Sequence, residues 1–252
     1  MSGYDSARLA AAYAFDRPPV HHRLLRSARL GGRARRALDV GCGAGLSTAA
    51  LAPLAEQVVG LEPVPAMLAH RRTVAPAAGF VVGTAERLPF GAGTFDLVTA
   101  AGALNYTDLP AALAEIARVL VPGGRLVLYD FSEGRRSAAG DALPGWFAAF
   151  EQRFPWPPGW RPLDPRTLPL TGSGLWLEDC AEVELPLPVS LQVYLRHVLG
   201  GLNVDAAVAR GACTAEQARD WCRATLAPLF AGGELTVLIP GYAATLRRDV
   251  RR

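Results

Sequence analysis

The sequence contains no lysine, so arginine supplies every basic side chain except histidine. The 26 basic residues nearly balance 23 acidic ones, and the formal net charge is only +3. Arginine pairs at 35–36, 71–72, 135–136 and 247–248 are scattered along the chain and form no single stripe. A nucleic-acid-binding protein gathers positive charge on one face. We therefore expect no nucleic-acid partner.

Long apolar runs and metal-ligand patterns are also missing. No run approaches the ~20 apolar residues of a membrane-spanning helix, and charged residues interrupt the first 17 positions, where a signal peptide would be apolar. The cysteines at 42, 180, 213 and 222 form no C-x-x-C pair and lie near no histidine at metal-ligand spacing, which favours free thiols. We expect a cytoplasmic protein without a membrane span or a bound metal, and the oligomeric state stays open.

Strand and helix patterns alternate through the first half of the chain. Apolar runs predict strands at 36–41, 57–61, 80–83, 94–100 and 125–131. Helical patterns separate them at 47–56, 64–72 and 109–120, after two further helices at 6–15 and 20–30. Such alternation with short connections predicts an α/β, Rossmann-like, doubly wound sheet that is mostly parallel, with helices on both faces.

The pattern changes after residue 131. Aromatic residues stand among prolines at 145–160, which argues against a long regular helix there. Further on, strands are predicted near 180–185 and at 234–240, with helices near 190–200 and 215–229. These two strands bring the predicted sheet to seven, and the segment as a whole predicts a helical and aromatic lid.

The stretch ALDVGCGAG at 37–45 is an apolar strand that ends in alternating glycines. Glycines after a first strand let a ligand lie against bare backbone. Their spacing is G-x-G-x-G, whereas dinucleotide folds show G-x-G-x-x-G. One acid, Asp39, stands near the end of this strand, and a second acid, Glu62, closes the next predicted strand. A carboxylate at that edge can accept hydrogen bonds from both hydroxyls of a ribose. The alternative is a tight strand-to-helix turn that binds nothing.

Several further motifs follow in order. They are LDVGCGAG at 38–45, GLEP at 60–63, GTAERLPF at 83–90 with TFDLV at 94–98, and EIARVLVPGGRLV at 115–127. In these motifs the chain resembles the class I S-adenosylmethionine-dependent methyltransferases, and within them the small-molecule group that includes ubiquinone/menaquinone-biosynthesis and trans-aconitate methyltransferases. The resemblance covers roughly residues 10–131. It implies S-adenosylmethionine as cofactor and S-adenosylhomocysteine as product.

The resemblance also implies roles for single residues. The loop of Gly41, Cys42, Gly43 and Gly45 would lie under the methionine part and ribose of the cofactor. Asp39 would orient that loop or reach the cofactor's ammonium group, and Glu62 would bind the ribose hydroxyls. The residues assigned to adenine are Pro63, Met67, Thr84, Ala85 and Glu86. Ala101 and Gly102 would line the sulfonium end, and Tyr13 and Arg17 would be lid residues, with Arg17 facing the cofactor carboxylate.

Some of these implied roles have simpler alternatives. The position of Thr84 is often aspartate in the family, so its contact to the adenine amino group is in doubt, and Glu86 is a partial replacement. Asp39 could cap backbone amides of its own turn, and Glu62 could favour the positive end of the next helix. Met67 could be core filler, and Arg17 could be a surface arginine beside a proline turn.

The proposed catalytic residues are Asn105, Tyr106 and His197, with Tyr194 beside His197 on one predicted helical face. A lone histidine on an apolar helix is more often structural. His21 and His22 are expected to face solvent or the lid. The aromatic residues Trp146, Phe147, Phe150, Trp156 and Trp160 could cover an apolar substrate or simply pack a core. The pair Asn105–Tyr106 lacks the two prolines of the N-P-P-Y motif of base-amine methyltransferases.

Three regions follow from this reading. Residues 1–35 would be N-terminal lid helices, 36–131 the S-adenosylmethionine-binding core, and 132–252 a substrate-side insertion with the last strands of the sheet. The expected activity is methyl transfer to O, N or C of a small molecule by direct displacement. A catalytically silent cofactor-binding protein is the main alternative. An NAD(P)-dependent oxidoreductase fits less well, because of the glycine spacing and because no Tyr-x-x-x-Lys pair exists without lysine.

Overall fold

A computed structural model describes residues 6–140, 142–156 and 163–250. Five strands pair in parallel and form the first part of one sheet. They are β1 (Ala34–Val40), β2 (Ala55–Glu62), β3 (Gly79–Val82), β4 (Phe95–Ala101) and β5 (Leu120–Phe131). Their spatial order is β3-β2-β1-β4-β5. Strands are thus added on one side of β1 up to β3 and on its other side from β4 on, and the switch point lies between β1 and β4. In such sheets ligands bind at this switch point, outside the carboxyl ends of the strands.

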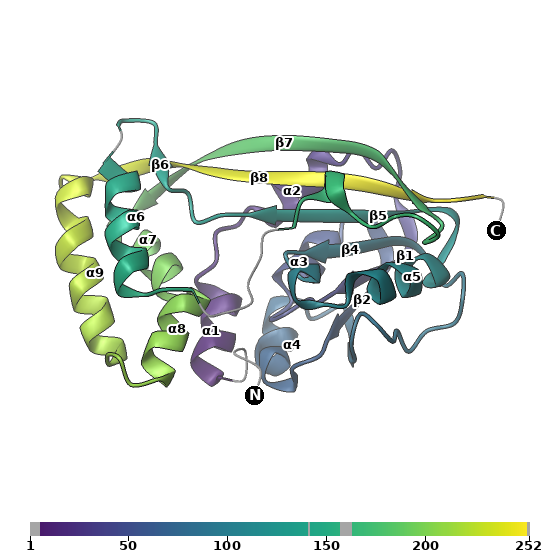
Figure 1. Cartoon of the computed structure of the whole chain (residues 1–252), viewed down its shortest axis with the longest axis horizontal. Coiled ribbons are helices and arrows are strands. Elements are labelled where there is room, and N and C mark those ends of the chain that lie inside the picture. Colours follow the sequence, from purple (N-terminus) through teal and green to yellow (C-terminus); the bar gives the residue numbers. More distant parts are fainter. Residues whose placement is uncertain (1–5, 141, 157–162, 251–252) are drawn as a thin grey trace.

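The sheet continues with antiparallel strands. β8 (Glu234–Arg248) pairs with β5, and β7 (Leu175–Ser190) and the short β6 (Arg136–Ser137) both pair with β8. The predicted doubly wound, mostly parallel fold is confirmed. The sheet has eight strands and not seven, because the two-residue β6 adds one. β7 and β8 are also longer than predicted, since each continues past the sheet core to the helices at one end (Figure 1).

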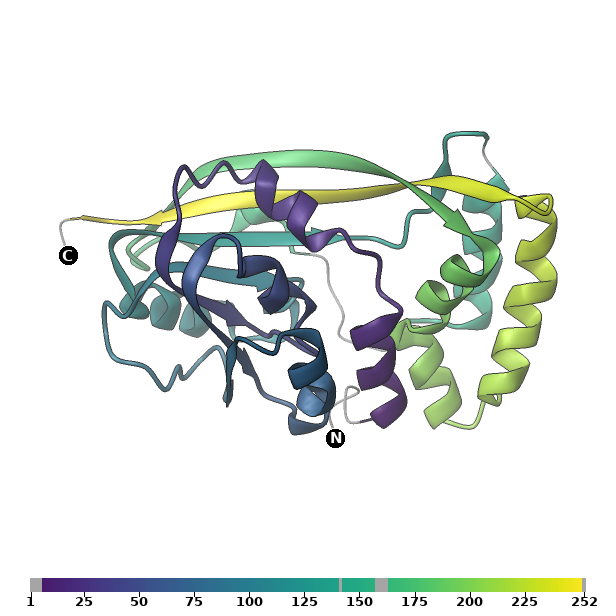
Figure 2. The same cartoon turned by 180° about the vertical axis from the view of Figure 1, so that it is seen from behind.

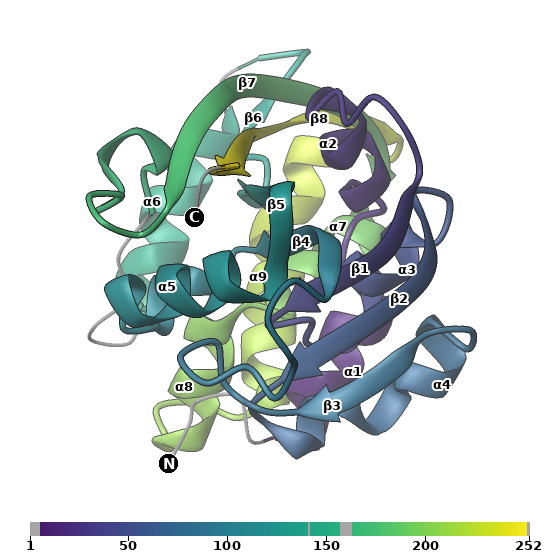
Figure 3. The same cartoon turned by 90° about the vertical axis from the view of Figure 1, so that its right-hand side faces the viewer.

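Alternating side chains of the parallel strands feed two separate cores, one on each face. Ala37 and Leu97 belong to a cluster with residues of α2 (His21–Ser27) and α3 (Leu46–Leu51). The next residues along the strands, Leu38 and Val98, join α5 (Leu109–Val119) in the other cluster. Successive side chains of a strand point to opposite faces, so helices cover both faces, as the end-on view shows (Figure 3).

Helices gather beyond one end of the sheet core (Figures 1 and 2). We call α6 (Ala142–Arg153), α7 (Leu191–Leu199), α8 (Leu202–Ala209) and α9 (Ala215–Phe230) the helical lobe. Rings fill its interior: Trp146 stacks on Phe150 with centroids 4.9 Å apart, and Trp221 lies 5.9 Å from Trp146. The indole of Trp146 also donates to the Thr225 hydroxyl at 2.8 Å. α1 (Ala7–Phe15) lies between this lobe and the sheet core (Figure 2).

Several predicted helices differ in the structure. The helix predicted at 47–56 ends at Leu51, because Pro53 cannot donate the amide that a longer helix needs. The segment 64–72 is a 3-10 helix, η1 (Pro65–His70), that runs into the short α4 (Arg71–Val74). The prediction against a regular helix at 145–160 was wrong for its first part, which is α6. Pro144 stands in the first turn of α6, where a missing amide is tolerated, and Pro155 follows the end. α8 was not predicted.

Within residues 6–140, 142–156 and 163–250, no helix is long and apolar enough to cross a bilayer. The four cysteines are free thiols in the structure, with Cys42 and Cys222 buried. Over the same residues, no group of three or more His, Cys, Asp or Glu side chains gathers as a metal site would require.

Candidate functional site

Asp39 links the two ends of the glycine loop and the neighbouring strand through hydrogen bonds. Its side chain is fully buried near the end of β1 and accepts hydrogen bonds from the hydroxyls of Ser47 (2.6 Å), Thr48 (2.7 Å) and Thr99 (2.9 Å). Burial raises the pKa of Asp39, and these three donors oppose the rise. The bonds tie the end of β1 to the first turn of α3 and to β4. The donors to Asp39 in these bonds are hydroxyl groups, and its role toward a cofactor stays a prediction.

The glycines of the loop are needed for different reasons. Gly41, Gly43 and Gly45 all have positive φ, at 67°, 53° and 100°, a region that costs other residues about 1–2 kcal/mol. At Gly41 a Cβ would also stand 2.3 Å from the Cβ of Ala103, so a side chain cannot fit without moving the loop after β4. Gly45 caps the N-terminus of α3. The loop therefore exposes backbone where β1 and β4 end.

Glu62 ends β2 and is buried beside the glycine loop. One carboxylate oxygen accepts the amide N–H of Gly43 at 3.0 Å and the other accepts that of Val64, also at 3.0 Å. Burial raises the pKa of Glu62, against the lowering effect of the two amides. An ionised carboxylate has about four lone-pair sites. Two acceptor sites thus remain for a ligand's hydroxyl groups.

A large cleft opens over these loops, with a volume of about 1750 Å³. It is lined by most of the residues predicted to bind the cofactor, and by two of the three predicted catalytic residues. These lining residues are Tyr13, Arg17, Gly41, Cys42, Gly43, Glu62, Pro63, Met67, Thr84, Ala85, Glu86, Ala101, Gly102, Asn105 and Tyr106. Asp39 and Gly45 are not among the residues that line the cleft. Ligand pockets are commonly 300–1,000 Å³, so this cleft has room for two molecules side by side.

Two lining side chains carry polar atoms that are buried and lack a hydrogen-bond partner among the described residues. These atoms are the Nε of Arg17 and the amide Oδ1 of Asn105. The Arg17 guanidinium also stacks over the ring of Tyr13, 4.1 Å from its centroid. Buried polar groups are nearly always paired in folded proteins. Polar atoms without hydrogen-bond partners in the wall of a cleft are consistent with a polar ligand that would form those hydrogen bonds.

Asp130 lies at the carboxyl end of β5, on the same wall as Asn105. Its carboxylate accepts the amide N–H of Phe131 at 2.8 Å. Burial raises the pKa of Asp130, while the Phe131 amide, Asn105 and the charge of Arg17 lower it to a smaller extent. A Cβ at Gly102 would come within 2.8 Å of the Asp130 carboxylate. Asp130 was not among the site residues predicted from the sequence.

The expectation that His21 faces solvent or the lid was wrong, because it lines the cleft. The Nδ1 atom of His21 lies 3.2 Å from the Tyr129 hydroxyl, and the ring packs edge-on against Phe131 at 5.3 Å. Burial lowers the pKa of His21 to about 4, helped by the charges of Arg17 and His22. His21 is therefore neutral at pH 7. Its place in a polar helix gave no sequence signal for this, whereas His22 is exposed as expected.

His197 lies away from the large cleft. It is buried on α7 and lines a second, smaller cavity, whereas Asn105 and Tyr106 line the cleft. The structure thus does not bring the three predicted catalytic residues together, and the catalytic role of each stays a prediction. Tyr194, beside His197, donates its hydroxyl proton to the Gly134 carbonyl at 2.6 Å.

The aromatic segment divides between core and cleft. Trp146, Phe147 and Phe150 are buried inside the helical lobe, which favours the core-packing interpretation for them. Trp156 lines the cleft and donates its indole N–H to Glu151 at 3.0 Å. Trp160 lies outside the described residues.

Comparisons with known proteins agree with the fold and the motifs. Residues 38–128 match the family model described as a methyltransferase domain. An uncharacterized methyltransferase of Mycobacterium bovis is 42% identical over 95 residues, which are 38% of this chain and 39% of that protein. The demethylmenaquinone methyltransferase of Beutenbergia cavernae is 43% identical over 98 residues, or 38% and 41% of the two chains. The matched region thus spans about two fifths of these relatives.

Solved structures match over far more of the chain. A candidate type II methyltransferase of Anaeromyxobacter dehalogenans has a TM-score of 0.63 at 21% identity, covering 92% of this chain and 96% of its own. A geranyl diphosphate methyltransferase in complex with S-adenosylmethionine has a TM-score of 0.51 at 17% identity, covering 90% and 84%. At such identities the likeness shows the fold.

Residues 38–128 thus match a methyltransferase domain in sequence, and the fold and the glycine loop agree with that match. The helical lobe and the β7–β8 pair lie outside the matched residues.

Proposed function

We propose that the protein is an S-adenosylmethionine-dependent methyltransferase that acts on a small molecule. The observation that carries the proposal is the cleft itself, in which the glycine loop, Glu62 and the loop after β4 meet at one edge of the sheet. The orphaned atoms of Arg17 and Asn105 in its wall support a polar ligand there. The volume of about 1750 Å³ supports a cofactor and an acceptor in the same cleft.

The residues fit the cofactor that the resemblance implies. Gly41 and Gly43 line the cleft and carry no side chain, as a ligand packed against the main chain requires. The free acceptor sites of Glu62 suit a pair of ribose hydroxyls. Arg17 carries a buried donor that suits a carboxylate. Pro63 and Met67 give the cleft an apolar patch that suits a purine ring.

When bound, S-adenosylmethionine supplies a methyl group on a positively charged sulfur. The task of the chain is then to align the acceptor and keep water out, which can lower a barrier by roughly 7–11 kcal/mol at best. Asn105 and Tyr106 line the cleft next to Ala101 and Gly102 and are placed to orient the acceptor. Asp130 is placed to take a proton from a hydroxyl, amine or carbon acid. Its raised pKa makes it a stronger base than an exposed carboxylate.

Calorimetric titration with S-adenosylhomocysteine tests the cofactor. We expect the wild type to bind S-adenosylhomocysteine and not to bind NAD. Glu62→Gln keeps one oxygen acceptor but removes the charge, so the affinity should fall about ten- to a hundredfold. Glu234→Gln is the matched control, since Glu234 is exposed at the start of β8. NAD binding without S-adenosylhomocysteine binding, or an unchanged affinity in Glu62→Gln, would contradict the proposal.

A second experiment separates an enzyme from a silent binder. Cofactor with a radiolabelled methyl group is incubated with the protein and a panel of phenols, enols, carboxylic acids and amines. A methyltransferase labels at least one class, and Asp130→Asn should slow labelling of acceptors that lose a proton while sparing carboxylates. A protein that binds S-adenosylhomocysteine and labels none of the panel would be the catalytically silent alternative.

A further inference from the structure

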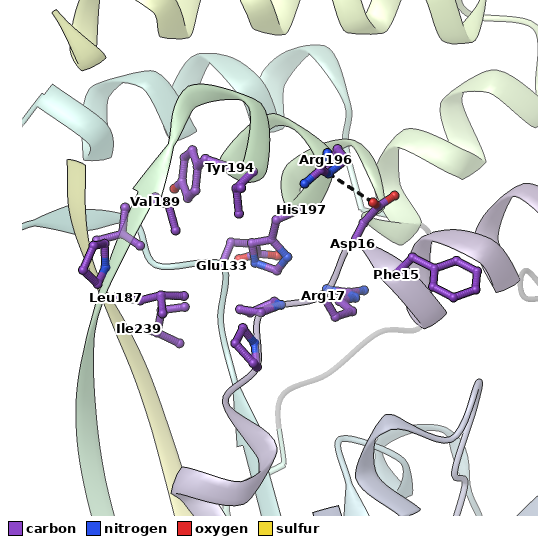
Figure 4. A pocket seen from close by; sticks show the side chains of 15 residues that line it. Phe15, Asp16, Arg17, Glu133, Leu187, Val189, Tyr194, Arg196, His197 and Ile239 are labelled. Carbon is purple, nitrogen blue, oxygen red and sulfur yellow. Dashed lines mark ion pairs between the residues drawn. The ribbon is translucent and has the colours of Figure 1, made fainter. Parts of the chain in front are cut away.

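The smaller cavity lies beside the cleft and has a volume of about 250 Å³ (Figure 4). Its walls come from the 15–19 segment between α1 and α2, from α7, and from the paired parts of β7 and β8. Arg17 and Glu133 line both this cavity and the cleft, so the two adjoin at these residues. The methyltransferase motifs contribute none of its lining. It is thus a separate site within the same molecule.

The lining is mainly aliphatic. Leu187, Val189, Val193, Val237 and Ile239 face it, together with prolines from both sides. Phe15 and Val193, which also line the cavity, are 56% and 40% exposed. The cavity therefore suits an apolar molecule.

The charged residues around the cavity are engaged with one another. Asp16 pairs with Arg196 at 3.4 Å, as the dashed line in Figure 4 marks. Glu133 pairs with Arg135 at 3.4 Å, and Arg17 stacks on Tyr13. Of the two arginines that line the cavity, Arg196 thus has a carboxylate beside it, and the carboxylate of Glu133 faces the same space as Arg17. An ionised ligand of either sign would meet a like charge there.

Besides the Nε of Arg17, the unpaired buried polar atoms of the wall among the described residues are the two ring nitrogens of His197. His197 is 4% exposed, and neither Nδ1 nor Nε2 has a hydrogen-bond partner there. Burial and the charge of Arg17 lower its pKa to about 3, so the ring is neutral at pH 7. A neutral imidazole presents one donor and one acceptor. A buried imidazole that makes neither hydrogen bond is unfavourable. This points to a ligand that forms a hydrogen bond with one of the two ring nitrogens.

We propose that this cavity binds a single-ring, uncharged molecule whose hydroxyl group hydrogen-bonds to the imidazole of His197. An apolar cavity of about 150 Å³ accommodates benzene, so about 250 Å³ accommodates a substituted ring. A hydroxyl group both donates and accepts, and it matches either tautomer of His197. A ligand carboxylate can only accept a hydrogen bond, and its negative charge would be repelled by the carboxylate of Glu133. The inference goes beyond the proposed methyl transfer and does not depend on it.

The test uses p-cresol, toluene and 4-methylbenzoate, which share a ring and a methyl group and differ in the polar group. The full chain is labelled with ¹⁵N-histidine, and the ring nitrogens of its four histidines are followed by NMR during each titration. We expect p-cresol to shift the His197 nitrogens saturably and to leave those of His22 in place. Toluene should bind roughly three- to tenfold more weakly, because it lacks the hydrogen bond, and 4-methylbenzoate more weakly still.

Two variants sharpen the result. His197→Leu keeps an apolar wall and should weaken p-cresol about three- to tenfold while leaving toluene unchanged. Val193 lines the cavity and is itself exposed, so Val193→Trp should fill the cavity and block all three probes even if the His197 variant fails to fold. Val82→Trp is its control at an exposed site on β3. No saturable His197 shift with p-cresol, or equal binding of p-cresol and toluene, would overturn the proposal.

Discussion

In the sheet core, each loop that faces the cleft follows directly on a strand, whereas the helical lobe is held by contacts between segments far apart in the chain. Asp39 reaches Ser47 and Thr48 only eight and nine residues on. In the lobe, Trp146 reaches Thr225, 79 residues on, and Asn203 donates to the Phe154 carbonyl, 49 residues back. Contacts between near neighbours thus contribute more at the cleft's polar edge than in the lobe, although Asp39 also accepts from Thr99, 60 residues on. The two regions should respond differently to substitution.

The largest effect is expected in the lobe. Phe150 is 3% exposed and contacts the rings of Trp146 and Phe154. Phe150→Ala should lower the free energy of unfolding by about 3–5 kcal/mol, because it leaves a cavity in a ring cluster. Since none of these rings lines the cleft, the affinity for S-adenosylhomocysteine should stay within about threefold. Urea unfolding and calorimetry measure the two quantities.

The exposed Phe15 provides the matched substitution, and Phe15→Ala should change stability by no more than about 0.5 kcal/mol. A tenfold loss of S-adenosylhomocysteine affinity in Phe150→Ala would break the comparison, since it would mean that the lobe sets the shape of the cleft.

In the sheet core, substitution of Gly41 should lower stability somewhat less and weaken the binding of S-adenosylhomocysteine strongly. Gly41→Ala places a Cβ 2.3 Å from Ala103 in a left-handed conformation, and the strain and overpacking together should cost about 2–5 kcal/mol. S-adenosylhomocysteine affinity should fall at least tenfold, because the loop must move. Gly93 has the same left-handed φ, at 62°, but open space around it. Gly93→Ala should therefore cost only about 1–2 kcal/mol, and an equal cost in both variants would show that the close approach is unimportant.

The smallest effect concerns the buried His197 and the half-buried His21, both of which feel the charge of Arg17. The pKa of His21 is about 4 and that of His197 about 3, both below the usual histidine value of about 6.5. The unfolded chain thus binds more protons below pH 6.5, so stability is present above that pH and is lost as pH falls toward the folded pKa. Between pH 7 and pH 5 each histidine should cost about 2 kcal/mol.

The measurement is the free energy of unfolding at pH 7 and pH 5 for the wild type, His21→Gln and His197→Gln. The drop should shrink by about 2 kcal/mol in each variant. Asp39, Glu62 and Asp130, whose pKa values are raised, act in the opposite direction, but they are common to all three proteins. His22→Gln alters an exposed side chain of the same helix and is the control. An undiminished drop in both variants would show that these rings are not held neutral.

Much of the core could be predicted because its signals are local. The apolar runs at 36–41 and 57–61 gave β1 and β2, and the motifs placed the cleft residues from Gly41 to Gly102 at one edge. The predicted length of α3 was wrong because Pro53 outweighed the helical pattern. In the lobe, prolines after residue 154 obscured α6, whose apolar face becomes evident only when α9 lies against it.

The sequence by itself determined the doubly wound sheet, the glycine loop and the acids at the ends of β1 and β2, because strand periodicity and backbone freedom are properties of neighbouring residues. Only the tertiary structure decided which side chains share a cavity. It brought His21 to Tyr129 across 108 residues and placed His197 in a cavity of its own. It also left polar atoms of Arg17, Asn105 and His197 buried without partners among the described residues. Burial and pairing depend on chain segments that meet only after folding, and no local pattern records them.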